Sequence, residues 1–215
     1  MPEFVLYHFP TACSQVVRFA LEHASLPYRL RLVDFMAGEQ FMADYLRISP
    51  LGKVPVLTVD GEPLTENIAI LAYLAALRPD AGLLPAHPDP RAVAEIQAGL
   101  SFCSSVLHPI VRGLGNPTRL TTGDTAGVRE RAHELAAKAF GHAEQRLAER
   151  GWWLGSWSVI DVYLHWAFST AVRGGSDATA TPVLAGLRSR LGDIDAFVRV
   201  LGWETKDAAA FGLTV

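Results

Sequence analysis

A cysteine and a serine near the amino terminus are the first residues whose types and position suggest chemistry. The residues after Cys13 and Ser14 are apolar at helical spacing, which places both at or near a helix start. Backbone N–H groups at a helix N-terminus stabilise a thiolate, so Cys13 is a candidate reactive thiol. A small buried hydrophobic position would suit a free cysteine equally well. A dithiol oxidoreductase is disfavoured, because the third residue after Cys13 is Val16.

A second group of candidates lies in the segment 51–74, LGKVPVLTVDGEPLTENIAILAYL. Pro55 opens an apolar run that is expected to be a strand, a position where proline does little harm to the sheet. The Val54-Pro55 bond is a candidate for the cis form. Asp60-Gly61 predicts a tight hairpin turn to a second, short strand. The segment therefore predicts a strand, a hairpin, a strand and a helix.

Glu66 and Asn67 precede the helical apolar run over 68–77, so their side chains are expected at a helix N-terminus beside the backbone of Val54. Such a place suits a small peptide. The strand edge can pair with its backbone, the carboxylate can bind its ammonium group, and the helix N–H groups can bind its carboxylate. Helix capping alone would also explain Glu66.

His108 is the candidate of the second half of the chain, in the segment LSFCSSVLHPIV. A lone histidine on a mostly apolar helix is usually a packed or partly exposed residue, and a role in a site is the alternative. His165 and Cys103 are assigned to packing.

The elements that must position these residues divide the chain in two. Residues 1–77 are expected to form strands and helices in the order βαβαββα, with the first two strands parallel. Segment 78–90, RPDAGLLPAHPDP, contains four prolines and is the predicted linker. Residues 91–215 have helical apolar spacing and no credible strand. The helices are expected at about 91–112, 124–150, 158–173 and 182–201. The expected fold class is α/β plus all-α, in two domains.

Composition narrows the function further. The chain has 215 residues, 50% of them hydrophobic, so it can bury a sizeable core. Its 19 basic and 22 acidic residues give a net charge of −3, which offers no case for a nucleic-acid or anionic-membrane partner. The longest apolar run is too short to span a bilayer, and the segment MPEFVLYHFP lacks a basic n-region. Two cysteines are too few for a disulfide framework, and the expected location is the cytoplasm.

Two segments resemble a known family. SPLGKVPVL followed by LTENIAILAYL is similar to the glutathione-binding half of cytosolic glutathione S-transferases, a thioredoxin-like domain in which the proline is cis. YHFPTACSQVVRFAL resembles the first loop and helix of the bacterial beta class. LGSWSVIDVYL, with a capping box at Ser158 and Asp161, is similar to the central helix of the family's C-terminal domain.

The resemblance assigns roles to the candidates. It implies that Cys13 is the active-site cysteine and Ser14 the neighbouring serine beside the glutathione sulfur. His108 then resembles a histidine that points into the cleft between the domains. Tyr7 matches a strand-end tyrosine that is catalytic in other classes, although here it is expected to pack.

The same resemblance implies a set of contacts with glutathione. Glu66 and Asn67 match the pair that holds the γ-glutamyl group, with Asn67 in place of the usual Ser or Thr. Lys53 could pair with a carboxylate of the tripeptide or be solvated. Together the expected glutathione-binding residues are Tyr7, Lys53, Val54, Pro55, Glu66, Asn67 and Ser101. Two departures, Ser101 for an asparagine and Pro109 for a basic residue, suggest a different charge around the electrophile.

The expected function is a glutathione transferase with glutathione as co-substrate, a small apolar electrophile, no metal and a homodimeric assembly. Conjugation, thiol transfer through a mixed disulfide at Cys13, and glutathione-dependent isomerase or dehalogenase chemistry stay open. The alternative of another class is a non-catalytic binding or interaction module that has kept the fold.

Overall fold

The computed structural model describes residues 1–213, which form two compact units. The first unit contains residues 1–83 together with the chain from residue 192 onward, and the second contains residues 84–191. The division after Leu83 lies inside the segment predicted as the linker. The C-terminal helix was predicted to belong to the helical domain, whereas the structure groups it with the first unit.

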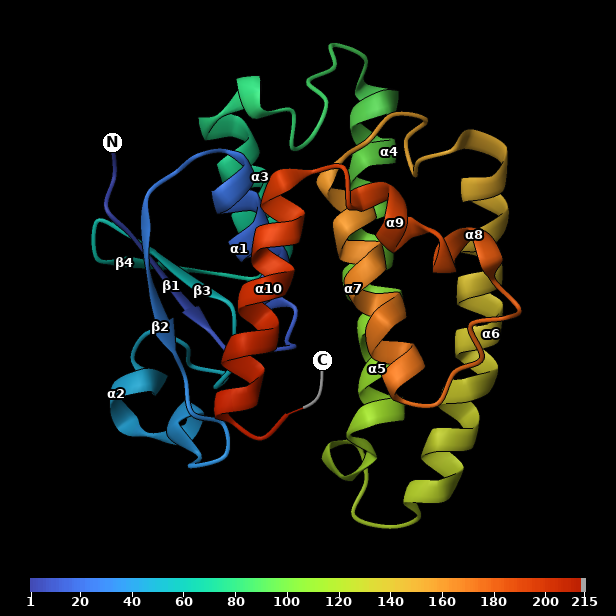
Figure 1. Cartoon of the computed structure of the whole chain (residues 1–215). Helices are drawn as coiled ribbons and strands as arrows, with labels where there is room; N and C mark the ends of the chain where they lie inside the picture. Colours follow the sequence, from blue (N-terminus) through green and yellow to red (C-terminus); the bar gives the residue numbers. More distant parts are fainter. Residues whose placement is uncertain (214–215) are drawn as a thin grey trace. The chain divides into compact units, whose positions relative to one another are not determined.

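The first unit is built on a four-stranded mixed sheet in the order β2-β1-β3-β4 (Figure 1). The strands are β1 (Phe4–His8), β2 (Tyr28–Leu32), β3 (Val56–Val59) and β4 (Glu62–Thr65). Strand β1 runs parallel to β2, with Leu6 opposite Leu30, and antiparallel to β3, with Leu6 opposite Leu57. Strands β3 and β4 form the predicted hairpin, and Asp60 and Gly61 both have positive φ, as a tight turn requires.

The two faces of the sheet are covered by different helices. Because side chains alternate along a strand, Phe4, Leu6 and His8 share one face of β1, and all three are buried. Phe4 contacts Tyr73 of α3 (Asn67–Leu77), and α3 packs against α1 (Ser14–His23). On the other face, Tyr7 packs edge-to-face on Tyr45 of α2 (Ala43–Leu46), which follows the short helix η1 (Glu39–Phe41). The order βαβαββα is confirmed.

Helix α10 (Asp195–Ala210) packs against α1 and completes the first unit. Phe197 and Val200 are buried on its inner face, and the ring of Phe197 lies edge-on to Phe19, with centroids 6.4 Å apart. The spacing over 182–201 predicted one helix. The structure instead has α8 (Pro182–Ala185), α9 (Leu187–Leu191) and α10, because Gly192, Asp193 and Ile194 separate the last two.

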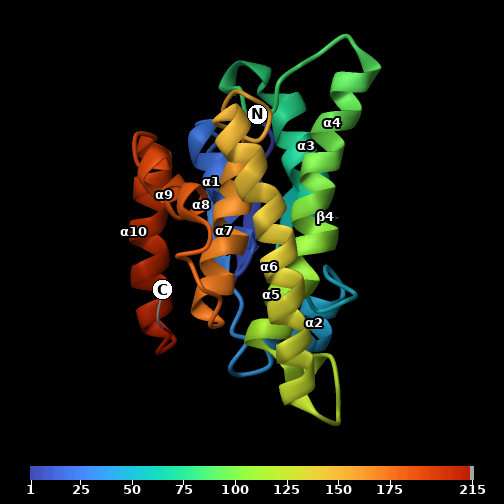
Figure 2. The ribbon, with the colours of Figure 1, turned by 90° about the vertical axis from the view of Figure 1, so that its right-hand side faces the viewer.

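The regular elements of the second unit, residues 84–191, are all helices, and the structure describes every residue of this range. Figure 2 shows α4 (Pro90–Ser101) and α5 (His108–Gly115) following one another along one line. A π-helical segment, Phe102–Leu107, joins them. Pro109 has no N–H group, and its ring would clash with the carbonyl four residues earlier, so a regular α-helix cannot run through this point. The proline thus accounts for the irregular segment.

Helices α6 (Thr125–Arg150) and α7 (Val159–Arg173) pack beside α5. Helix α7 is the buried centre of this unit and begins with the predicted capping box at Ser158 and Asp161. The Asp161 carboxylate accepts hydrogen bonds from the N–H groups of Trp153, at 2.9 Å, and Ser158, at 3.0 Å. The expected fold class, a thioredoxin-like domain followed by a helical domain, is therefore confirmed.

Candidate functional site

Cys13 lies where three segments of the first unit meet. It is the N-cap residue of α1, and its side chain is 7% exposed. The thiol donates a hydrogen bond to the Val54 carbonyl, with sulfur and oxygen 3.7 Å apart. The Asn67 amide donates to the Cys13 carbonyl at 3.2 Å. The structure thus brings together Cys13, the Val54-Pro55 bond and the start of α3.

The Val54-Pro55 peptide bond is cis, as the sequence suggested. The backbone of Lys53, the residue before Val54, is held by two buried side chains. The Lys53 carbonyl accepts hydrogen bonds from the hydroxyl of Tyr45 at 2.7 Å and from that of Ser49 at 2.9 Å. Burial raises the pKa of Tyr45 above its ordinary value, so its hydroxyl stays a neutral donor. The side chain of Lys53 itself is exposed.

Glu66 has an unusual backbone conformation at the start of α3. Its φ is +69° and its ψ is 121°, and the residue is exposed. A non-glycine residue with positive φ is strained, and such residues cluster at functional sites. Asn67 behaves differently, because it is buried and its amide nitrogen is used inside the protein. Its Oδ1 atom is also buried and accepts no hydrogen bond from residues 1–213.

Ser14 is fully buried, and its hydroxyl lies toward the interior. Its Oγ atom is 2.7 Å from Nδ1 of His8 and 3.4 Å from the carbonyl oxygen of Phe9. On the other side of the ring, Nε2 of His8 is 2.9 Å from the Glu204 carboxylate. A carboxylate at Nε2 favours the tautomer with hydrogen there, so the Ser14 hydroxyl donates its proton to Nδ1. In that state it has no proton left for a substrate sulfur.

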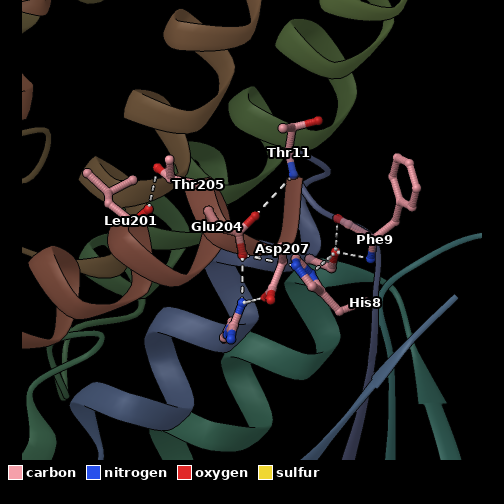
Figure 3. Close-up of polar contacts among 9 residues, drawn as sticks. His8, Phe9, Thr11, Leu201, Glu204, Thr205 and Asp207 are labelled. Carbon is pink, nitrogen blue, oxygen red and sulfur yellow. Dashed lines mark hydrogen bonds and ion pairs between the residues drawn. The ribbon is translucent and has the colours of Figure 1, made fainter. Parts of the chain in front are cut away.

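The Glu204 carboxylate is the centre of this buried network (Figure 3). It accepts a hydrogen bond from the Thr11 N–H at 3.0 Å and lies 3.2 Å from the Arg18 guanidinium. Arg18 also pairs with Asp207 at 2.7 Å. Burial raises the pKa of Glu204, but the contacts with His8, Thr11 and Arg18 outweigh it and leave the pKa below its ordinary value. Glu204 is therefore charged at neutral pH.

The sequence analysis did not identify His8, Arg18 or Glu204. Two signals for them were available. His8 follows Phe4 and Leu6 at alternate positions, which places a polar residue on the buried face of β1. Glu204 lies seven residues after Phe197, on the apolar face of its helix.

The remaining predicted residues lie elsewhere. Tyr7 packs on Tyr45 in a small core with Val33 and Val56, as expected for its packing role. Ser101 and His108 belong to the second unit. Ser101 is exposed at the end of α4, and its carbonyl accepts a hydrogen bond from the Ser105 hydroxyl at 2.7 Å. The ring of His108 packs on two aromatic residues of α7, 4.7 Å from Trp166 and 5.9 Å from Tyr163 between centroids.

Neither a metal nor a membrane site emerges from the described chain. Residues 1–213 contain no cluster of three or more His, Cys, Asp or Glu side chains suited to a metal ion. None of the helices among these residues combines the length and the apolar character needed to cross a membrane.

Comparison with known proteins agrees with the thioredoxin-like fold of the first unit. Residues 2–76 match the family described as glutathione S-transferase, N-terminal domain. Glutathione S-transferase GST-4.5 of Xanthomonas campestris is 32% identical over 205 residues, which cover 92% of this chain and 98% of that protein. The maleylacetoacetate isomerase of Rhizobium meliloti is 34% identical over 208 residues, covering 92% and 95%.

Two solved bacterial structures are similar over almost the whole chain. A beta-class glutathione S-transferase of Sphingomonas chungbukensis superposes with a TM-score of 0.82 and 29% identity, covering 93% of this chain and 98% of that one. A sphingomonad glutathione S-transferase complexed with glutathione has a TM-score of 0.81 and 31% identity, with the same coverage. The chain belongs to the cytosolic glutathione S-transferase family, and the resemblance noted in the sequence is confirmed.

Proposed function

We propose that the protein is a glutathione transferase whose first unit binds glutathione and presents its thiolate to a small apolar electrophile. The observation that carries the proposal is the meeting of Cys13, the Val54 carbonyl and the start of α3. The strained, exposed Glu66 lies at the same helix N-terminus, where a carboxylate can bind an ammonium group.

The chemical task is to ionise a thiol. A free thiol has a pKa near 8.5, so only about 3% is thiolate at pH 7. Lowering the pKa by about two units makes the anion dominant and requires roughly 2.7 kcal/mol of preferential stabilisation. The N-terminus of α1 supplies partial positive charge at Cys13. Because the Ser14 hydroxyl is committed to His8, we assign the stabilisation of the thiolate to this helix end instead.

The first test is a calorimetric titration of the reduced protein with glutathione, repeated with Glu66→Ala. Glu62 is a matched control, since it is also an exposed glutamate and lies at the other end of the same short strand, β4. Saturable binding that Glu66→Ala abolishes and Glu62→Ala preserves is the expected result. No binding up to about 10 mM, an affinity worth less than roughly 3 kcal/mol, would favour the non-catalytic module.

A second candidate activity is a glutathione-dependent isomerisation, which the similarity to maleylacetoacetate isomerase favours. Both reactions need the same glutathione thiolate. Conjugation consumes glutathione, whereas the isomerisation returns it unchanged. The two are separated by following glutathione consumption with an apolar electrophile and the isomerisation of a cis-dicarbonyl acid in parallel. Attack of the Cys13 thiolate on a glutathione disulfide, which breaks that disulfide and releases one thiol, would form a mixed disulfide and add thiol transfer to the activities. Cys13→Ala removes this step.

His108 and Ser101 are proposed to act on the electrophile. His108 rests on Trp166 and Tyr163, which hold its ring in place. A His108→Phe change keeps the aromatic packing and removes the ring nitrogens. It is expected to reduce turnover of the electrophile while the affinity for glutathione stays the same.

We also propose a homodimer, acting in the cytoplasm. Four large apolar side chains of the segment 36–51 are strongly exposed: Met36, Phe41, Met42 and Leu51. Exposed large apolar side chains gathered in one segment are typical of an interface. Light scattering should give a dimer, and Phe41→Ser should weaken it. The exposed Val198 of α10 provides the control, since Val198→Ser should have no effect.

A further inference from the structure

The loop that carries Cys13 has a strained backbone. Thr11 has a φ of +66°, a conformation in which a β-branched residue is a true outlier. The residue belongs to the segment between β1 and α1, Phe9–Cys13, which we name the Cys13 loop. A conformation of this kind persists only when its surroundings hold it.

The contact that holds Thr11 comes from the far end of the sequence. The Thr11 N–H donates to Oε2 of Glu204 at 3.0 Å, and Glu204 belongs to α10. The other carboxylate oxygen, Oε1, faces Nε2 of His8 at 2.9 Å and the Arg18 guanidinium at 3.2 Å. Of these three partners, His8 precedes the Cys13 loop, Thr11 lies within it and Arg18 follows it. A single carboxylate therefore contacts the Cys13 loop at Thr11, the strand before it at His8 and the helix after it at Arg18. Figure 3 shows Glu204 with Thr11 and His8.

The Glu204 carboxylate is buried together with its partners, which strengthens its hold on the Cys13 loop. Glu204 and His8 are fully buried, and Arg18 is nearly so. A charge-assisted hydrogen bond to a backbone N–H in such surroundings is stronger than the same bond in water. Asp207, one turn further along α10, also pairs with Arg18.

We propose that Glu204 is a positioning residue for Cys13, holding the Cys13 loop in the conformation that places the thiol at the start of α1. This inference rests on the proposed function, since it gives Cys13 the role of the reactive thiol. The residue touches neither the thiol nor, in our proposal, the substrate. It acts through Thr11 and His8.

The test measures alkylation of Cys13 by iodoacetamide across pH, in the absence of glutathione. The alkylation test is therefore independent of the glutathione titration, so a failure of this inference can be distinguished from a failure of the proposed function. Peptide mass spectrometry separates Cys13 from Cys103, which is fully buried in the second unit. Alkylation of Cys103 then reports unfolding of that unit.

Glu204→Gln is the main variant, and Asp207→Asn is its matched control on the same helix. We expect Glu204→Gln to raise the plateau rate of Cys13 alkylation by at least about fivefold, because the loop opens locally more often. Asp207→Asn should change it by less than about twofold, and Cys103 should stay unmodified in both. An unchanged rate in Glu204→Gln, or an equal rise in Asp207→Asn, would overturn the proposal.

A second measurement uses the unchanged protein and so does not depend on how the variants fold. The Thr11 amide should exchange its hydrogen with solvent at least about tenfold more slowly than an unprotected amide, because it donates to a buried carboxylate. Exchange at the unprotected rate would show that Glu204 does not hold the loop.

Discussion

Ser14 was expected beside the glutathione sulfur, and the structure gives its hydroxyl an internal partner instead. Ser14→Ala should therefore act on stability first. The change leaves a buried His8 nitrogen without its donor, which costs about 1–3 kcal/mol of unfolding free energy. Urea denaturation measures the loss, and the exposed Ser105 is the control, with an expected change within about 0.5 kcal/mol. A variant of unchanged stability that fails to ionise bound glutathione would restore the predicted donor role.

Asn67, at the start of α3, also has an internal hydrogen-bond partner at the candidate site. Its amide donates to the Cys13 carbonyl from a buried position, so it links α3 to the start of α1. Asn67→Ala should cost about 1–3 kcal/mol and also weaken glutathione binding, because the two helix starts lose their connection. Asn116 is an exposed asparagine at the end of α5, and Asn116→Ala should not affect binding. Full affinity in Asn67→Ala would limit the residue to a structural role.

At the scale of elements, two helix starts of the second unit carry aspartates in very different surroundings. Asp124 caps α6 in solvent and accepts from the N–H groups of Ala126 and Gly127. Asp161 lies in the first turn of α7, is fully buried, and accepts from the N–H groups of Trp153 and Ser158. Asp124→Ala should cost about 1 kcal/mol. Asp161→Ala leaves buried N–H groups unpaired and should cost about 3 kcal/mol or more. Chemical denaturation compares the two, and equal losses would contradict the role given to burial.

Helix α7 also contains two groups with opposite pH dependence. Burial lowers the pKa of His165 to about 4 and raises that of Asp161 to about 6. As pH falls from 6.5 to 4.5, His165 costs about 2 kcal/mol of stability, because the unfolded chain binds its proton first. Over the same range Asp161 contributes about 2 kcal/mol, because the folded chain binds its proton first. The two effects nearly cancel.

His165→Leu removes the opposing contribution of His165, so the pH dependence of stability that is due to Asp161 should become measurable. As pH falls from 6.5 to 4.5, the variant is expected to gain about 2 kcal/mol of stability relative to the unchanged protein. Denaturant unfolding at a series of pH values measures this, with the exposed His87→Leu as control. A variant that loses stability over the same range would show that the pKa of Asp161 is not raised.

Most elements of the fold could be predicted because their signals are local. Pro55, the Asp60-Gly61 turn and the Ser158 capping box each specify structure within a few residues, and all three appear as predicted. The division of 182–201 into separate helices and the grouping of α10 with the first unit could not be predicted in the same way. They depend on contacts between residues far apart in the sequence, such as Thr11 and Glu204, which are 193 positions apart.

At the scale of the whole molecule, α10 makes the first unit discontinuous in sequence. The unit needs the chain from residue 192 onward to cover α1, whereas residues 84–191 form the second unit without interruption. Without α10, the burial of Phe197 and Val200 is lost, worth roughly 2 kcal/mol each. Arg18 also loses its buried counter-charge, and His8 loses the carboxylate that lies 2.9 Å from its Nε2 atom. Such a loss is comparable with the total stability of a domain.

A chain that ends at Leu191 should therefore keep its second unit and lose its first. Four of the five tryptophans lie in residues 84–191, so near-ultraviolet circular dichroism of the truncated chain reports the second unit alone. Hydrogen exchange along β1 reports the first. We expect the tryptophan signal to remain and the protection of β1 to disappear. A peptide of residues 192–213 should restore that protection, and the same peptide with Glu204→Gln should restore it less well. Protection of β1 in the truncated chain without peptide would mean that α10 is dispensable for the fold and that the restraint on the Cys13 loop is its main contribution.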